Sequence, residues 1–216
     1  MSLKINSLNE NTVIESFRSI AKALFFDYKL KVNDAYYQLL EIEFYYYNEN
    51  CFRDVYAHKH KYQLLNGKWY SHGSGLDITF GDGNNYGGIL LRAIVKVGEE
   101  YPVEKPIFGP LKVKTEILSE LHGVFDEKPN NFYLEKVSEI ETSKKELEHK
   151  YIVETQRIGL TPEKDSDDNK YYNGKFRFII YPNIGHKNKT QIAKDLQEQY
   201  LLSEGEVNKL MGSKFL

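Results

Sequence analysis

The sequence predicts a single α+β domain over residues 1–216, in which strands and helices are interspersed without a regular βαβ repeat. Short runs rich in aromatic and β-branched residues recur along the chain and end at polar turn signals, as strands do. Segments with helical spacing of apolar residues stand near the start, in the middle and at the end. The length suits one large domain, and the chain has no repeat and no clear linker.

The first half of the chain is expected to begin with a helix and continue as strands. Apolar side chains at helical spacing favour the helix, and alternation or buried apolar runs favour the strands. The expected elements are a helix over 12–25 capped by Asn11 or Thr12, strands over 28–34 and 36–47 joined at Asn33–Asp34, a loop over 48–66, and strands over 75–80 and 87–97.

The second half mixes helices, strands and charged loops. Residues 124–150 carry the most charge and predict no definite element. The expected elements are a helix over 109–123, a strand over 151–160, a surface loop over 161–174, a strand over 175–183, and one or two helices over 189–212.

Composition indicates an ordinary globular protein, with 41% hydrophobic and 28% charged residues. The single cysteine, Cys51, excludes a disulfide framework, and the absence of a long apolar run predicts a cytoplasmic protein without a membrane segment. The net charge of −2 argues mildly against tight binding of duplex DNA unless charge is segregated on the surface. Nothing indicates an obligate protein partner, and we expect a monomer.

The segment LLEIEFYYYNEN, residues 39–50, raises the first functional question. Side chains in a strand alternate between faces, so Glu41, Glu43, Tyr45 and Tyr47 are expected to share one face. That face is either the solvated side of a sheet or the lining of a pocket. A neighbouring carboxylate such as Glu41 would also raise the pKa of Glu43.

Arg92 lies within the apolar run ILLRAI. An arginine inside such a strand is costly unless it is paired or reaches into a site. The alternatives are an exposed arginine, a structural ion pair with Glu41, and a side chain that enters a pocket.

Two motifs suggest a metal or a phosphate site only weakly. His58-Lys59-His60 follows Asp54, but no third ligand stands at a diagnostic spacing and the segment is expected to be a loop. The glycine-rich run GDGNNYGG leads into a strand rather than a helix, which favours a turn over a phosphate cradle. We therefore expect neither a metal nor a cofactor.

Taken in order, several segments resemble the alkyladenine (3-methyladenine) DNA glycosylase family. SIAKALFFDYKL is similar to the end of the family's first helix, and LEIEFY is similar to its catalytic strand. Together the similar segments cover roughly residues 15–181, and their order and spacing carry the resemblance. It implies a curved, mainly antiparallel sheet surrounded by helices. The other matching segments are Ala57-His58, ILLRAI (89–94), GPLK (109–112), RIGL (157–160) and FRFI (176–179).

The resemblance implies roles for particular residues. Glu43 would activate the water that attacks C1′ of the sugar, and Tyr45 would stack on an extruded base. His58 would contact base and backbone, and Arg92 would lie near the same pocket. Trp69 would form the opposing aromatic wall.

Two positions depart from the family pattern. Thr79 stands where the family has the Asn that rejects the exocyclic amine of guanine, and His72 falls near the wedge that replaces the flipped base. Both departures concern the choice of substrate more than the hydrolytic chemistry. The segment WYSHGSGLDITFG also differs from the family's usual run, which indicates a divergent member.

Together these residues predict an N-glycosidic hydrolase that removes a damaged purine from DNA. Stacking on an aromatic ring contributes about 1–3 kcal/mol per base, so two rings could offset the cost of flipping. The alternative is a protein on the same fold that binds or processes a nucleotide, a nucleoside or a nucleotide-derived signal without binding duplex DNA. A third interpretation is a structural or protein-binding module in which Glu43 no longer acts.

Overall fold

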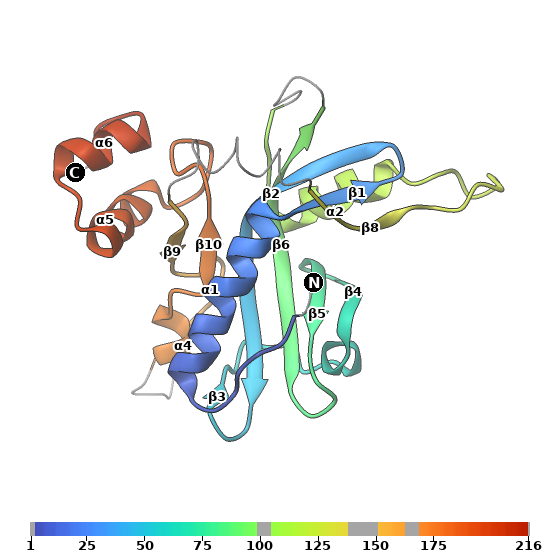
Figure 1. The fold of residues 1–216 in the computed structure, drawn as a ribbon, viewed down its shortest axis with the longest axis horizontal. Coiled ribbons are helices and arrows are strands. Elements are labelled where there is room, and N and C mark those ends of the chain that lie inside the picture. The colour runs from blue at the N-terminus through green and yellow to red at the C-terminus, as the bar shows by residue number, and fades with distance from the viewer. Residues whose placement is uncertain (1–2, 99–104, 138–150, 163–168, 216) are drawn as a thin grey trace.

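An antiparallel sheet curls through the centre of the molecule and helices pack around it (Figure 1). The computed structural model describes residues 3–98, 105–137, 151–162 and 169–215. The main strand order is β4-β5-β6-β2-β1-β8, with β10 and β3 also paired with β2, β9 paired with β10, and β7 paired with β6. This arrangement confirms the mixed α+β class and the curved, mainly antiparallel sheet.

The strands vary widely in length, and β2 and β6 are the longest of those described. The described strands are β1 (Tyr28–Val32), β2 (Ala35–Asn48), β3 (Phe52–Arg53), β4 (Asn66–His72), β5 (Gly75–Phe80), β6 (Tyr86–Val97), β7 (Ile107–Phe108), β8 (Phe132–Lys136), β9 (Val153–Thr155) and β10 (Arg177–Ile179). The described helices are α1 (Glu10–Phe26), the short 3₁₀ helix η1 (Lys61–Leu64), α2 (Pro110–Ser119), α4 (Lys170–Asn173), α5 (Lys189–Tyr200) and α6 (Glu204–Met211).

Strands β2 and β6 form the centre of the sheet and pair with each other over most of their length. The pairing shifts register around Glu41, where a β-bulge brings Glu41 opposite Ala93. A bulge re-aims the side chains beside it. Although the shift sets Glu41 opposite Ala93, its carboxylate still accepts a hydrogen bond from Arg92.

One row of residues crosses the sheet and lies on the face opposite α1. Residues directly opposite each other in an antiparallel pair share a face. The register aligns Arg177 of β10 with Glu43 of β2, Glu43 with Leu90 of β6, Leu90 with Asp77 of β5, and Asp77 with Tyr70 of β4. The sheet therefore brings polar side chains from distant parts of the chain onto one surface.

The other face of the sheet packs against α1 and forms an aromatic core. Phe17 of α1 stacks on Phe44 of β2 with ring centroids 4.5 Å apart, and Phe44 contacts Phe178 of β10 edge to face. Burial of these rings supplies much of the hydrophobic stabilisation. Alternation along β2 thus divides core residues from site residues.

Helix α1 begins at Glu10, two residues earlier than the apolar spacing predicts. Asn9, and not Asn11 or Thr12, is the N-cap, because its side chain accepts from the Thr12 N–H while the Thr12 hydroxyl accepts from the Asn9 N–H. This reciprocal pair is a capping box. The two preceding residues of the helix are polar and exposed or half-buried, so the apolar pattern did not reveal them.

The tail forms two helices, as expected, and they pack on the free side of β9 and β10. Ile192 and Leu196 of α5 and Val207 of α6 join Ile179 in a small second core. Its neighbour Phe178 belongs to the main core. Adjacent residues of one short strand therefore serve different cores, as the two-residue period of a strand allows.

Other expectations are corrected in their extent. Strand β4 was not expected, the expected strand over 151–160 is reduced to β9, and the segment after it is irregular. The loop over 48–66 contains β3 and η1, and the loop over 161–174 contains α4. Residues 138–150, within the charged segment, lie outside the described residues. No helix in the described part of the chain is both long and apolar enough to cross a membrane.

Candidate functional site

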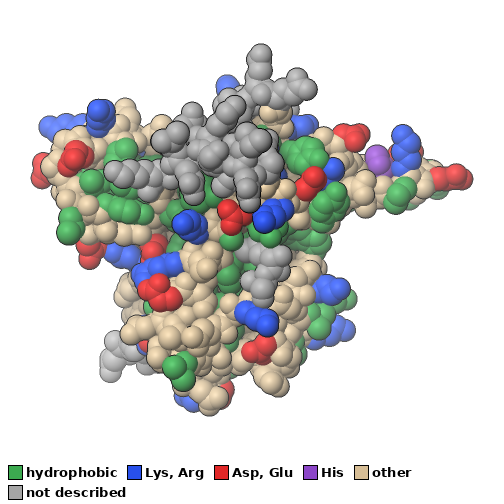
Figure 2. All heavy atoms as spheres, viewed as in Figure 1, with side chains coloured by type: hydrophobic (Ala, Val, Ile, Leu, Met, Phe, Trp, Pro, Cys, Tyr) green, Lys and Arg blue, Asp and Glu red, His purple; other side chains and the backbone are tan. Residues whose placement is uncertain are grey.

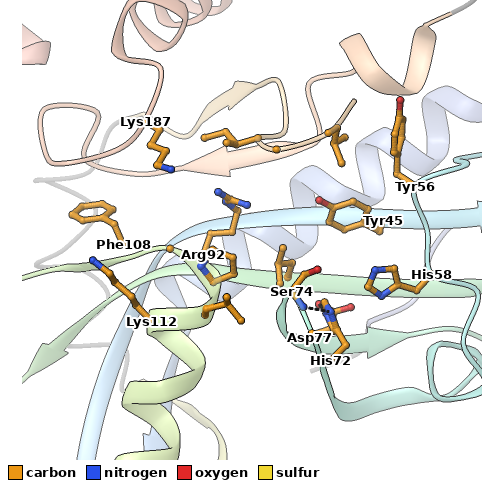
Figure 3. A pocket seen from close by; sticks show the side chains of 18 of the residues that line it. Tyr45, Tyr56, His58, His72, Ser74, Asp77, Arg92, Phe108, Lys112 and Lys187 are labelled. Carbon is orange, nitrogen blue, oxygen red and sulfur yellow. Dashed lines mark hydrogen bonds and ion pairs between the residues drawn. The ribbon is translucent and has the colours of Figure 1, made fainter. Parts of the chain in front are cut away.

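A cavity of about 780 Å³ opens on the polar row of the sheet (Figure 3). Its volume falls within the range of about 300–1,000 Å³ that is usual for sites of small molecules and cofactors. Its walls come from β2, β5, β6, the start of α2, and the irregular segments around 56–58 and 158–160. The lining residues are Tyr45, Tyr56, His58, Gln63, His72, Gly73, Ser74, Asp77, Leu90, Arg92, Phe108, Gly109, Pro110, Leu111, Lys112, Ile158, Gly159, Leu160 and Lys187.

Four of the residues singled out from the sequence line this cavity together: Tyr45, His58, His72 and Arg92. Glu43 and Glu41 lie directly beneath them. Glu43 accepts from the Tyr45 hydroxyl at 2.8 Å and from Arg92 Nη1 at 3.3 Å. The expectation that the Glu41/Glu43/Tyr45 face meets solvent is therefore excluded, because both carboxylates are buried.

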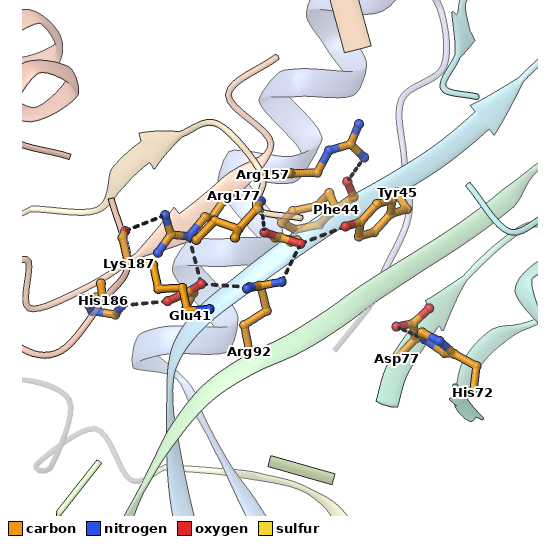
Figure 4. A network of polar contacts seen from close by, with 12 residues as sticks. Glu41, Phe44, Tyr45, His72, Asp77, Arg92, Arg157, Arg177, His186 and Lys187 are labelled. Atoms are coloured by element: carbon orange, nitrogen blue, oxygen red, sulfur yellow. Dashed lines mark hydrogen bonds and ion pairs between the residues drawn. The ribbon is translucent and has the colours of Figure 1, made fainter. Parts of the chain in front are cut away.

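Glu43 is held by three donors and is fully buried (Figure 4). Besides Tyr45 and Arg92, the backbone N–H of Ile158 donates to Oε1 at 2.8 Å. Burial raises the pKa of Glu43, and the charge of Arg92 and these hydrogen bonds offset the rise only partly. The neighbouring charge of Glu41 adds to the rise. Such a carboxyl is suited to proton transfer at a pH where an ordinary glutamate stays ionised.

Glu41 holds together the other end of the same network (Figure 4). It accepts from Arg92 Nε at 2.9 Å and from Arg177 Nε at 2.8 Å, and its second oxygen lies 2.8 Å from His186 Nδ1. Burial alone would raise the pKa of Glu41. The hydrogen bond from His186 and the charge and hydrogen bond of Arg177 outweigh that effect and hold the pKa well below its usual value. The expected pair of Glu41 and Arg92 is confirmed.

Arg157 supports the aromatic wall from behind. Its guanidinium forms a buried two-point ion pair with Asp54, at 2.6 and 3.0 Å, and donates to the carbonyls of Phe44 and Tyr171. The guanidinium carbon lies 4.4 Å from the centre of the Tyr45 ring. A cation against one face of a tyrosine fixes the ring and leaves the other face for a ligand. Asp54 is thus occupied by Arg157.

One end of the cavity is cationic. Arg92, Lys112 and Lys187 all line it, and Figure 3 shows the three side chains around that end. Helix α2 starts there with Gly109 in a conformation with positive φ and without a side-chain cap. Pro110 has no N–H group and the Gly109 N–H donates to the Arg92 carbonyl, so an anion would be bound by the N–H groups of the first turn that follow Pro110. This end of the cavity therefore suits a phosphate or a carboxylate.

The opposite end carries acidic, amide and imidazole groups. His72 Nε2 lies 2.9 Å from Oδ1 of Asp77, and Gln63 Nε2 donates to Oδ2 at 3.3 Å. The His58 ring stands edge-on to the His72 ring at 4.5 Å. Burial and the nearby His72 lower the pKa of His58. Between the two ends, Tyr45 and Tyr56 supply flat surface for a ring.

Trp69 does not lie on the cavity, which corrects the wall assigned to it by resemblance. Its ring stacks on Phe132 with centroids 4.2 Å apart, and its indole N–H donates to the Phe132 carbonyl. Alternation along β4 turns the next residue, Tyr70, toward the polar face, where it stacks on His60 at 4.8 Å. The pairing of β4 with β5 shifts register between Asn66 and Trp69.

Thr79 and His72 also lie differently from what their assigned roles need. Thr79 is buried away from the cavity, and its hydroxyl accepts from the Lys68 N–H at 2.9 Å. The His72 side chain is 9% exposed and tied to Asp77. A wedge that enters a base stack must project from the surface, and this histidine does not.

Sequence reasoning missed several groups that shape the site: Gln63, Asp77, Lys112, Arg157, Arg177, His186 and Lys187. Lys112, Arg157 and Arg177 stand inside motifs that carried the resemblance, so those motifs could have drawn attention to them. Asp77 sits alone in the apolar strand GLDITF, a signal of the kind that Arg92 gave. Gln63 comes from the short 3₁₀ helix η1, and His186 and Lys187 come from an irregular segment, so no periodicity marks them.

The face that carries α1 does not look like a surface for duplex DNA. Basic residues (lysines and arginines) and acidic residues are interspersed over this face, with hydrophobic side chains between them (Figure 2). Proteins that grip a nucleic-acid backbone concentrate positive charge on one face.

Within the described residues, no group of three or more His, Cys, Asp or Glu side chains is arranged to hold a metal ion.

Comparison with known proteins finds one similar chain of undescribed activity. The "Uncharacterized protein L759" of Acanthamoeba polyphaga mimivirus is 27% identical over 223 aligned positions, which span 87% of this chain and 94% of the viral protein. No protein-family model matches the chain. The similarity to the viral protein extends over nearly the full length of both chains.

Proposed function

We propose that this protein is an N-glycosidic hydrolase on a glycosylase-like fold, which releases a purine base from a nucleotide unit of DNA with Glu43 as the acting carboxylate. One observation carries the proposal. Five separate segments that resemble alkyladenine DNA glycosylases meet at a single cavity, although they are spread from residue 43 to residue 160. They contribute Glu43 and Tyr45, His58, Arg92, Gly109–Lys112 and Ile158–Leu160.

The chemistry needs a carboxylate next to a flat binding surface. In base release, the oxygen of a water forms a bond to C1′ while the bond from C1′ to the base nitrogen breaks and its electrons stay on the base. The transition state resembles an oxocarbenium ion, which a nearby negative charge stabilises. Glu43 takes the proton from the water, and the ring of Tyr45 holds the base.

The position of Glu43 sets one condition for this mechanism. The carboxylate lies one layer below the cavity, covered by Tyr45, Arg92 and Ile158, which all line it. Water reaches Glu43 only when one of these partners gives up its hydrogen bond. The contact from Arg92 Nη1, at 3.3 Å, is the longest of the three and the first candidate to open.

A second candidate function follows from the same burial. Glu43 has no exposed surface, and three protein groups already occupy it. The cavity with its cationic end also suits a nucleotide that is bound and not cleaved. The net charge of −2 favours a small ligand over a duplex.

The decisive experiment compares the wild type with Glu43→Gln on alkylated DNA, on DNA containing hypoxanthine, and on free purine nucleotides. The hydrolase proposal expects base release by the wild type and none by Glu43→Gln, with equal binding. The release of base by Glu43→Gln at the wild-type rate would contradict it. The absence of release by the wild type, together with nucleotide binding, would favour the second candidate.

Retention on a DNA column separates the two ligands of these proposals. Contacts to a phosphate backbone release counterions, so retention falls steeply as salt rises. If the substrate is a nucleotide unit within DNA, the chain is retained at low salt and eluted by moderate salt. If it passes through the column even at low salt, a free nucleotide is the ligand.

A further inference from the structure

We propose that Asp77 and Gln63 form a base-reading site at the acidic end of the cavity, which selects a nucleobase with an exocyclic amine over the matching base with an oxo group. The inference rests on the proposed nucleobase pocket, but it does not depend on base release. It concerns which base enters, a question that the glycosylase resemblance leaves open.

Asp77 is buried, lines the cavity, and is held in place from two sides. His72 Nε2 contacts Oδ1 at 2.9 Å, and Gln63 Nε2 donates to Oδ2 at 3.3 Å. An ionised carboxylate can accept about four hydrogen bonds, so these two donors leave acceptor capacity. The carboxylate is therefore oriented by the protein and still able to take donors from a ligand.

The tautomer of His72 follows from its second contact. The backbone N–H of Ser74 points at Nδ1 of His72 at 3.2 Å, and an N–H group can only donate. Nδ1 therefore holds a lone pair, and Nε2 carries the proton that is donated to Asp77. Both ring nitrogens are used within the protein, so His72 acts as a positioning residue for the carboxylate.

Gln63 supplies a second acceptor that lacks a donor. The side chain is 1% exposed and lines the cavity, and its Oε1 has no hydrogen-bond partner among the described residues. Turning the amide over would set Oε1 against Oδ2 of Asp77, two acceptors face to face, so Asp77 fixes the orientation. A buried acceptor without a donor is costly, and an N–H group of a ligand would satisfy it.

The backbone leaves room for this polar pair. A Cβ at Gly88 would lie 2.6 Å from both Oδ2 of Asp77 and Nε2 of Gln63. Gly88 also pairs with Tyr45 across β2 and β6. The two acceptors therefore lie beside the ring that is proposed to stack on the base, at the level of the edge that a stacked base would present.

The chemistry of the bases then sets the preference. Adenine and cytosine present an amine donor where hypoxanthine and uracil present a carbonyl acceptor. An amine meets the oxygens of Asp77 and Gln63 as a donor, whereas a carbonyl would face two acceptors and leave its own oxygen and Oε1 of Gln63 without a donor. A site built on buried polar groups rejects the wrong partner strongly for this reason.

The test measures affinity for AMP and IMP by calorimetry. We expect the wild type to bind AMP at least about tenfold more tightly than IMP, since a hydrogen bond to a charged group accounts for a factor of this size. Asp77→Asn replaces one acceptor by a donor and should lower or reverse the ratio. Gln63→Met, which removes the unsatisfied acceptor and keeps the bulk, should lower it and serves if Asp77→Asn does not fold.

Lys112→Ala is the matched control at the other end of the cavity. It should weaken AMP and IMP by the same factor and leave their ratio unchanged. Equal affinity of the wild type for AMP and IMP, or no binding of either, overturns the inference. So does a ratio that is unchanged in folded Asp77→Asn or Gln63→Met.

Base release is measured separately and keeps the two proposals distinguishable. A preference for AMP without any release of base supports the base-reading site and refutes the hydrolase. Equal affinity for AMP and IMP together with base release refutes the base-reading site and leaves the hydrolase standing.

Discussion

Glu41 accepts a 2.9 Å hydrogen bond from Arg92 Nε across a bulge that puts their two strands out of step. The register on either side of the bulge, Leu39 with Ile94 and Ile42 with Leu91, would set Glu41 directly opposite Arg92, and the shift sets it opposite Ala93 instead. The hydrogen bond therefore spans one residue of offset between the two strands. Because Glu41 also accepts from Arg177, it acts as a structural anchor beneath the cavity.

Glu41→Gln should destabilise the protein by about 3–5 kcal/mol, because it removes the buried carboxylate that pairs with Arg177 and leaves Arg92 with Glu43 alone. Urea unfolding measures the change. Glu49→Gln is the matched control, since Glu49 forms an exposed pair with Arg53 and should contribute less than about 1 kcal/mol. Equal effects of the two substitutions would contradict the anchoring role.

Stability should fall in acid, and Glu41 should account for part of the fall. Its pKa is lowered in the folded state, so its contribution is present above the unfolded value of about 4.3 and is lost as pH drops toward the folded value. Unfolding followed from pH 6 to pH 2 should therefore give a shallower decline for Glu41→Gln than for the wild type. Parallel declines would show that Glu41 is not the titrating group.

The pH profile of base release should rise through a midpoint above the ordinary glutamate range. Glu43 must be ionised to accept a proton from water, and burial raises its pKa. The contribution of Glu43 to the stability of the fold changes with pH in the opposite direction to that of Glu41. The folded state holds the Glu43 proton more tightly, so the contribution of this group declines as pH rises from about 4.3 through the raised value. A rate that stays constant over that range would exclude Glu43 as the base.

Arg157→Lys should both destabilise the protein and weaken nucleotide binding. A lysine cannot form the two-point pair with Asp54 and cannot also reach the carbonyls of Phe44 and Tyr171. The Tyr45 ring would lose the planar cation at its back. Thermal unfolding and calorimetry measure the two effects, with the exposed Arg53→Lys as control. If folded Arg157→Lys bound the nucleotide with unchanged affinity, Arg157 would not be needed to hold the Tyr45 ring in place for binding.

Tyr45→Ala and Trp69→Ala form a pair that tests the corrected aromatic wall. Removing Tyr45 deletes a stack of about 1–3 kcal/mol, which corresponds to roughly tenfold to a hundredfold in affinity for a purine nucleotide. Trp69 packs on Phe132 outside the cavity, so its removal should lower stability and leave the affinity within about twofold. A larger loss of affinity for Trp69→Ala would indicate that Trp69 does contact the ligand.

The long, strongly patterned elements could be predicted from the sequence. Strands β2 and β6 and helix α1 have enough regular positions for periodicity to identify them. The pair of Glu41 and Arg92 could be predicted as one alternative, because a charge in an apolar strand needs a partner. Alternation along β2 predicted that Tyr45 shares a face with Glu43, and it left open whether that face lines a pocket or meets solvent.

Features that depend on register between distant strands could not be predicted in this way. Trp69 and Tyr70 are adjacent, and only the pairing of β4 with β5 decides which of them lies on the polar face of the sheet. The side chains of Asp77 and Gln63 meet where Gly88 has no side chain, since a Cβ there would clash with both, so the contact depends on three segments. His186 contacts Glu41 although the two residues are 145 positions apart in the sequence. Local patterns contain no information about such contacts.

The division of β2 between an aromatic core and a polar row has a consequence for how this protein can change. Around residues 41–45, the strand alternates between the polar network beneath the cavity, with Glu41, Glu43 and Tyr45, and the aromatic core against α1, with Phe44, so a change on one face disturbs the other. Substitutions in this strand that change the ligand preference will therefore also lower the thermal stability, whereas substitutions in the loops will not. A saturation scan should show altered selectivity without loss of folding mainly at positions contributed by the irregular segments.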